Sequence, residues 1–182
     1  MSSFSERLSA AKEADRPTRE VVVCLDSVVS EQRAKLKAEL EEARNPSDSR
    51  LSMAPDEELI QSKLDELIEL TEEALVTLRF TRLSGAEWSE IAARCPVRLD
   101  VAIDRQYGYN IHAACRIAAP LSGVVVDGDS VEKITEEEWN DLFATISGHE
   151  FGLIVDAIYA LNEWEPASHV AQLKKELETR PV

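Results

Sequence analysis

Apolar residues follow two patterns along this chain, and the pattern changes near Phe80. Between residues 27 and 79 they recur at intervals of three and four among charged residues, which predicts long amphipathic helices. From Phe80 onward the apolar stretches shorten and rings appear. Nine of the ten aromatic residues lie between Phe80 and Trp164, and Phe4 is the exception. Because large rings dominate core burial, we expect the compact core to begin at Phe80.

The first half of the chain predicts a strand followed by a helical hairpin. Residues 20–26 are rich in valine and favour a strand, which needs a pairing partner elsewhere in the chain or in another subunit. Ser27 is expected to cap a charged helix that runs to about Arg44. A polar loop at residues 45–55 precedes a second long helix, which opens at Asp56. The seam of that helix alternates spacings of four and three, as a heptad does: Ile60, Leu64, Leu67, Thr71, Ala74 and Leu78.

Two interpretations of this coiled-coil-like hairpin stay open. Either it packs on the main domain, or it is an arm that serves self-assembly or grips a partner. The second interpretation makes Leu64, Leu67 and Leu78 candidate partner-binding residues, whereas the first packs them inside the molecule. Further apolar residues widen the seam beyond that of two paired helices: Leu59, Ile68, Leu70 and Leu75.

Two capping boxes mark helix starts in the second half. Ser84 with Glu87, and Thr135 with Glu138, place a hydroxyl and a carboxylate three residues apart, so that each satisfies a backbone N–H at the helix start. A tryptophan follows each box at an inward helical position, which favours the core over a contact surface: Trp88 and Trp139.

Shorter elements fill the rest of the second half. We expect a helix at 100–106 capped by Asp100, a helix at 111–119 capped by Asn110, a hairpin at 124–134, an apolar helix at 151–161 that ends at 162–166, and a last helix capped by Ser168. The turn between the first two helices makes an exposed corner, whose candidate partner-binding residues are Tyr107, Tyr109 and Asn110. Turn chemistry and helix capping are the alternative explanation of these residues.

Together these elements predict a mainly α fold. We expect an N-terminal helical hairpin arm plus a compact multi-helix domain with at most a few short β-strands. The expected division is a flexible N-terminus (1–19), a short strand and charged hairpin (20–79), a compact helical domain (80–166) and a C-terminal helix and tail (167–182).

Charge and cysteine content narrow the function classes. The net charge of −15 is spread evenly, with 11 basic and 18 acidic residues in 1–79 and 9 and 17 in 80–182. No basic patch exists to neutralise phosphates, so nucleic acid and anionic membranes are not expected partners. Cys24, Cys95 and Cys115 form no disulfide framework, and no apolar run approaches the ~20 residues that span a bilayer. We expect a soluble protein of a reducing cytosol.

Metal and catalytic motifs are weak. Asp127, Asp129 and Glu138 imitate an EF-hand, but Val131 occupies a ligand position and Glu132 the position that needs glycine. The His112–Cys115 pair lacks the second pair that zinc requires. No glycine-rich phosphate loop or nucleophile motif is present. We therefore assign no catalytic, cofactor-binding or metal-binding residue.

One ordered pattern of aromatic, glycine and acidic residues follows an acidic helical region with a polar break, and together they span roughly residues 20–165. Its members in order are Phe80, Trp88, Arg98, Asp104, Tyr107, Gly108, Tyr109, Asn110, the segment 134–139 (ITEEEW), Leu142 and Asn162. In order and spacing the pattern resembles the tail assembly chaperones of long-tailed phages that infect actinobacteria.

That resemblance implies a non-enzymatic role. Such proteins bind the helical tape measure protein, keep it soluble and help the tail tube protein polymerise around it. The resemblance also implies the host cell cytoplasm, absence from the mature virion, and self-association or a longer frameshifted form. The residues alone leave two alternatives: an acidic helical adaptor that binds one folded partner through the 60–78 seam, and an enzyme with an unrecognised carboxylate site.

Overall fold

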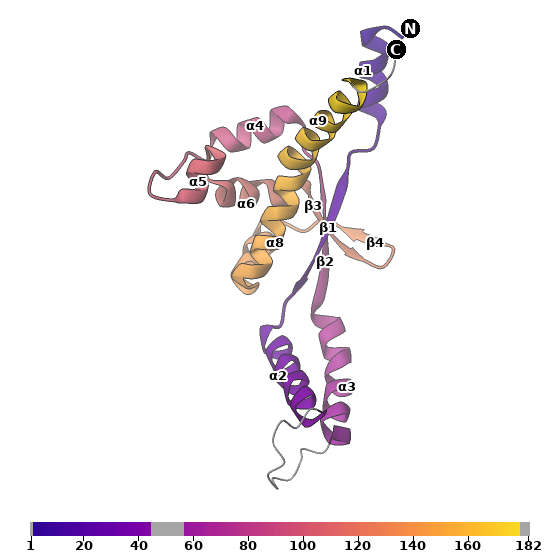
Figure 1. Cartoon of the computed structure of the whole chain (residues 1–182), viewed down its shortest axis with the longest axis vertical. Helices are drawn as coiled ribbons and strands as arrows, with labels where there is room; N and C mark the ends of the chain where they lie inside the picture. The colour runs from indigo at the N-terminus through magenta and orange to yellow at the C-terminus, as the bar shows by residue number, and fades with distance from the viewer. Residues whose placement is uncertain (1, 45–56, 179–182) are drawn as a thin grey trace. The chain divides into compact units, whose positions relative to one another are not determined.

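The computed structural model describes residues 2–44 and 57–178 (Figure 1). The predicted loop at 45–55 and the predicted helix start at Asp56 lie outside the described residues. By its internal contacts the chain forms two units that interleave along the sequence. The first unit combines Met1–Glu20, Arg79–Val124 and Ile154–Val182, and the second combines Val21–Leu78 and Val125–Leu153.

A four-stranded antiparallel sheet corrects the predicted fold class. Of the residues that the structure describes, 69% are helical, but the sheet makes it a mixed α/β fold, so the prediction of a mainly α fold with at most a few short strands is wrong. Two of the strands are seven residues long. In sheet order the strands are β1 (Thr18–Cys24), β2 (Leu75–Thr81), β3 (Gly123–Asp127) and β4 (Ser130–Glu132).

The incorrect prediction of the fold class arose at strand β2. The heptad-type spacing continues to Leu78, but helix α3 (Glu57–Ala74) ends before it, and the next seven residues read LVTLRFT. Their burial alternates as in a strand, because Leu78 and Phe80 are 0% exposed while Leu75 is 44% exposed. Leu78 is therefore a core residue of the sheet and does not belong to a helical seam.

Strands β1 and β2 pair within the chain, which answers where the predicted strand finds its partner. Beyond the two ends of the ladder, the Leu25 N–H donates to the Ala74 carbonyl at 2.8 Å and the Arg82 N–H donates to the Pro17 carbonyl at 2.9 Å. In both pairs the residue numbers sum to 99, as they must in an antiparallel ladder of constant register. Residue i of β1 therefore lies opposite residue 99 − i of β2.

Side chains support this register. Glu20 lies opposite Arg79, and its Oε1 accepts hydrogen bonds from Nε at 2.8 Å and Nη2 at 2.7 Å. The Cys24 N–H points away from β2, and the Glu150 carboxylate accepts it at 2.6 Å. Because an open strand edge invites pairing with other chains, Glu150 protects one end of β1.

Helices α2 (Ser27–Arg44) and α3 lie side by side as a hairpin, which we call the arm (Figure 1). Its predicted helical character is confirmed. The contact between the two helices is thin: Leu40, Ile60 and Leu64 form the buried cluster, and Leu36 packs half-buried against it.

The first capping box is confirmed at α4 (Gly85–Ala93), where the Ser84 hydroxyl and the Glu87 carboxylate each accept the other's backbone N–H. Helix α5 (Ala102–Tyr107) differs from the prediction. It starts after Val101, which makes no side-chain cap, so Asp100 is not its N-cap.

Helix α6 (Ile111–Ser122) runs further than predicted. Asn110 caps its start, as expected, but Pro120 lies inside the helix and does not end it. Beyond Ile111 its inner face is made of small residues, and the Cys115 thiol reaches the Val155 carbonyl at 3.7 Å. Small side chains permit this close approach to α8 (Gly148–Tyr159).

The predicted hairpin and second capping box are confirmed in the second unit. Strands β3 and β4 pair with Asp127 opposite Ser130, and Gly128 supplies the positive φ of +55° that the turn requires. Thr135 and Glu138 cap α7 (Glu136–Thr145).

The predicted helix end at residues 162–166 is wrong. Helix α8 continues through a π-helical turn, η1 (Ala160–Trp164), into α9 (Glu165–Glu178). The Glu165 N–H donates to the Ala160 carbonyl, five residues back. Pro166 lacks an N–H to donate, but the wider turn lets the helix continue, so Ser168 is an interior residue and not a cap.

The N-terminal segment also contains a helix. Helix α1 (Phe4–Glu13) begins with a third capping box, in which Ser3 and Glu6 exchange backbone N–H bonds. All of its residues are exposed, and Phe4 is 72% exposed.

A buried carboxylate anchors the loop between α4 and α5. Asp104 is 0% exposed, and it accepts hydrogen bonds from Arg98 Nε at 2.7 Å, Arg98 Nη2 at 3.0 Å and the Arg98 backbone N–H at 3.1 Å. These side-chain hydrogen bonds hold the pKa of Asp104 below its usual value of 3.8.

Replacing Leu78 tests its place in the sheet. Leu78→Ala should lower the free energy of unfolding by about 2–5 kcal/mol, because it leaves a cavity at a fully buried site. Leu75→Ala, on the exposed face of the same strand, should cost much less. Urea denaturation of both variants measures the difference, and equal losses would contradict the assignment of Leu78 to the core.

Removing the Asp104 charge should destabilise the protein in a pH-dependent way. Asp104→Asn should lower Tm by roughly 5 °C or more at neutral pH, whereas the exposed neighbour Asp100→Asn should not. Since the folded-state pKa of Asp104 is lowered, its contribution is present above about pH 4 and is lost as pH falls through that lowered value. Thermal melts of both variants from pH 7 to pH 2 should show the gap to wild type closing; a pH-independent gap would refute this account.

Candidate functional site

The arm candidates separate in the structure. Leu64 is 6% exposed in the buried cluster of the arm, and Leu67 is half-buried one turn further along α3. Leu78 lies on β2 and is fully buried. These three residues do not form an open seam, so a partner that uses the arm must contact other side chains.

The exposed apolar residues of α3 are those that widened the predicted seam. Leu59 is 54% exposed, Leu70 is 51% exposed and Ile68 is 38% exposed. At about 100° per residue, Leu59 and Leu70 lie on one flank of α3 and Ile68 on the other. Helix α3 therefore presents apolar side chains on both sides of its contact with α2.

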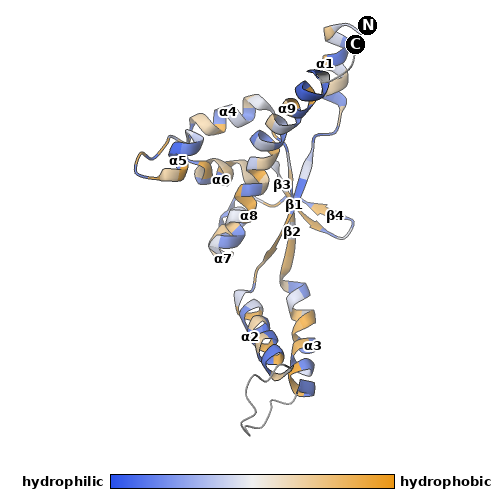
Figure 2. Cartoon of the chain, in the orientation of Figure 1, coloured by the Kyte–Doolittle hydropathy of each residue, from blue (hydrophilic) through white to orange (hydrophobic). Residues whose placement is uncertain are grey.

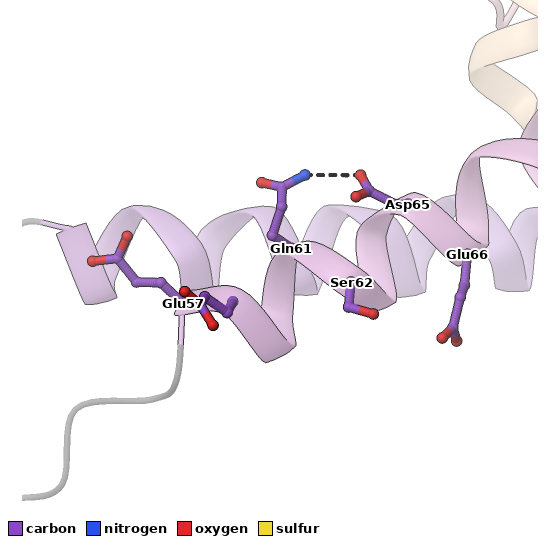
Figure 3. Close-up of a pocket in the computed structure, with 6 residues that line it drawn as sticks. Glu57, Gln61, Ser62, Asp65 and Glu66 are labelled. Atoms are coloured by element: carbon purple, nitrogen blue, oxygen red, sulfur yellow. Dashed lines mark hydrogen bonds between the residues drawn. The ribbon is translucent and has the colours of Figure 1, made fainter.

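Acidic residues occupy most of the remaining surface of α3. Its sequence contains seven acidic residues and one basic residue, a net charge of −6, whereas α2 contains four of each. A shallow groove of about 560 Å³ runs along Glu57, Glu58, Gln61, Ser62, Asp65 and Glu66. Gln61 Nε2 donates to Asp65 Oδ1 at 2.9 Å, while Glu57 and Glu66 point in other directions (Figure 3). These carboxylates fan outward and do not converge on one point.

A second groove, of about 330 Å³, lies between α2 and α3. Leu40, Leu64 and Ile68 are its apolar residues, and charged and polar side chains surround them: Arg33, Lys37, Glu41, Gln61 and Asp65. Figure 2 shows the same mixture of hydrophobic and hydrophilic residues along both helices.

The predicted corner is built around a carboxylate that the sequence analysis missed. Glu163 Oε1 accepts hydrogen bonds from the Tyr109 hydroxyl and from Trp88 Nε1, the latter at 2.8 Å. The Trp88 and Tyr109 rings meet edge-to-face with centroids 6.1 Å apart. Burial and the Glu163 hydrogen bond raise the pKa of Tyr109 well above its ordinary value.

The other corner residues have structural partners too. The Tyr107 ring packs edge-on against Tyr159 with centroids 4.8 Å apart, and Asn110 Oδ1 accepts the Ala113 N–H at 3.1 Å. Tyr107, Tyr109 and Asn110 are all half-buried. The corner is therefore a packed joint rather than an open contact surface.

The π turn supplies the polar groups of this joint. Glu163 and its neighbour Asn162 both lie in η1, and Asn162 Oδ1 accepts the Leu83 N–H at 3.0 Å. The sequence signal was present, because Asn162 and Pro166 mark an interruption. That signal does not distinguish the end of a helix from a π turn, because both interrupt the regular helical pattern.

Metal candidates find structural explanations. Residues 127–132 form a β-hairpin, and Glu138 caps α7. Burial raises the pKa of the Cys115 thiol well above its ordinary value, which disfavours the thiolate that zinc binds. Among the residues that the structure describes, no group of three or more His, Cys, Asp or Glu side chains is placed to hold a metal ion.

No protein-family model, curated protein or solved structure matches this chain. Within residues 2–44 and 57–178, no helix combines the length and the apolar character that a bilayer crossing needs.

Removing the Glu163 carboxylate should loosen the joint. Glu163→Ala leaves the N–H of the buried Trp88 and the O–H of the half-buried Tyr109 without their acceptor, at a cost of about 1–3 kcal/mol for each group that stays dry. The pKa of Tyr109 should also fall toward 10, which ultraviolet titration measures. Glu165→Ala, which breaks only the exposed 3.4 Å pair with Arg19, is the matched control and should cost little. Equal effects of the two variants would contradict a special role for Glu163.

Proposed function

We propose that this chain is a tail assembly chaperone of a long-tailed phage, which binds the tape measure protein, keeps it soluble and assists tail tube polymerisation. The observation that carries the proposal is the arm, a two-helix hairpin that exposes leucine and isoleucine side chains on an acidic surface. The ordered pattern from Phe80 to Asn162, which resembles that family, supports it independently.

Such a chaperone must cover the apolar surface of its client and keep the resulting complex in solution. A long helical client exposes apolar stripes that drive aggregation. Half-exposed residues such as Leu59 and Leu70 supply apolar area against a stripe of this kind. A net charge of −15 then keeps the complex soluble through mutual repulsion. No reacting group is required for this activity.

The alternative adaptor would use the same arm on one folded partner. Its proposed seam between residues 60 and 78 contains Ile60, Leu64 and Leu78, which are each at most 6% exposed. The exposed flanks of α3 suit an extended helical client better than this buried seam suits a folded one.

Co-expression tests the proposal. A tape measure fragment that is insoluble alone should move largely into the supernatant when this chain is expressed in excess. An unrelated acidic protein of similar size and charge controls for a general effect of charge. A fragment that stays in the pellet at saturating chaperone would refute the proposed function. The adaptor alternative instead expects one defined complex with a folded protein, which Leu67→Glu should abolish.

A further inference from the structure

One flank of α3 combines exposed leucine with acidic charge. Leu59 and Leu70 are 54% and 51% exposed and lie eleven residues apart, about three helical turns or 16 Å. Glu66 and Lys63 lie between them at about the same angle around the helix axis. We call these four residues the Leu59–Leu70 flank.

Helix α2 does not cover this flank. The buried cluster that joins the two helices contains Ile60 and Leu64, which lie on the inward side of α3. The two half-exposed leucine side chains lie at matching angles three turns apart, so they give one partner helix two apolar contact points with Lys63 and Glu66 between them. The flank is therefore an unpartnered face within the described residues.

The charge of α3 indicates which kind of partner helix can dock on the flank. Seven acidic residues against one basic residue give α3 a net charge of −6, and a second α3 laid beside it would bring two such surfaces together. Like charges at helix-contact distance destabilise pairing, whereas lysine or arginine beside the contact is attracted. The surface disfavours a second copy and favours a cationic partner.

We propose that the Leu59–Leu70 flank docks a basic amphipathic helix, with leucine-type residues against Leu59 and Leu70 and lysine or arginine along the acidic borders of α3. The inference rests on the proposed function and deepens it, because it names the chemistry of the client segment. Glu73 borders the flank on the outer side of α3 and is exposed.

A synthetic peptide tests the docking directly. The probe is a labelled peptide of about 18 residues, the length of α3, with leucine on one helical face and lysine elsewhere. A second peptide has the same composition in scrambled order. Fluorescence anisotropy with the full chain should show the amphipathic peptide binding at least about tenfold more tightly than the scrambled one. Binding should weaken in about 1 M salt, where the Debye length is about 3 Å.

Paired variants locate the site. Leu59→Ser with Leu70→Ser should weaken binding of the amphipathic peptide by about tenfold or more. Leu121→Ser with Leu173→Ser is the matched control, because both residues are helical leucines that are 58% exposed, and its Kd should stay within about twofold of wild type. Leu59→Ala with Leu70→Ala keeps higher helix propensity and repeats the test should the serine pair lose structure by circular dichroism.

Three results would overturn the proposal. In the first, the scrambled peptide binds as tightly as the amphipathic one, so that charge alone drives binding. In the second, the Leu121→Ser with Leu173→Ser control loses as much affinity as Leu59→Ser with Leu70→Ser. In the third, the wild type is a dimer that Leu59→Ser with Leu70→Ser converts to a monomer, so that a second copy occupies the flank. Peptide binding without solubilisation of a tape measure fragment retains the flank and refutes the chaperone. If Leu59→Ser with Leu70→Ser leaves solubilisation of the fragment unchanged, the chaperone function is retained and the flank is refuted as its binding site.

Discussion

The antiparallel pairing of β1 with β2 is the constraint on which the fold depends. It joins segments on either side of the arm, and the constant sum of 99 defines every cross-strand contact, including the Glu20–Arg79 ion pair. Closing so long a loop costs conformational entropy, which the ladder offsets by burying Val21, Val23 and Leu78. Without this pairing, α2 and α3 would depend on their own contact, which is thin.

The arm balances packing between its two helices against the exposure of apolar side chains to a partner. A hairpin that buried all its leucines would be more stable but would have nothing to offer a client. Here one inward stripe, Leu40 with Ile60 and Leu64, holds the helices together, and the flanks remain open. The same division explains the charge distribution, because carboxylates beside half-exposed leucines discourage association between copies and leave the surface accessible to cationic helices.

Some local signals predicted local structure well, although the Asp100 cap and the helix end at 162–166 were wrong. The errors over Leu78 and Glu163 came from distant contacts. Capping boxes such as that at Thr135 were found because the hydroxyl, the carboxylate and the N–H groups lie within one helical turn. Leu78 was misplaced because its spacing suits both a heptad and a strand, and only pairing with β1 decides between them. Glu163 was missed because its partners, Trp88 and Tyr109, lie 75 and 54 residues away. Leu59 was noticed, but its exposure depends on which stripe α2 covers.

The π turn has a consequence for how this chain tolerates insertions and deletions. A π turn takes more residues to complete than an α turn, so consecutive side chains differ less in direction, and Asn162 and Glu163 serve neighbouring groups from adjacent positions. Because the turn accommodates one residue more than an α turn, deleting one residue from Ala160–Trp164 would restore an ordinary α-helix and leave the side chains that follow nearly in phase, whereas a deletion inside α9 would turn everything after it by about 100°. Within the continuous helix from α8 to α9, a one-residue deletion is therefore best accommodated at this turn.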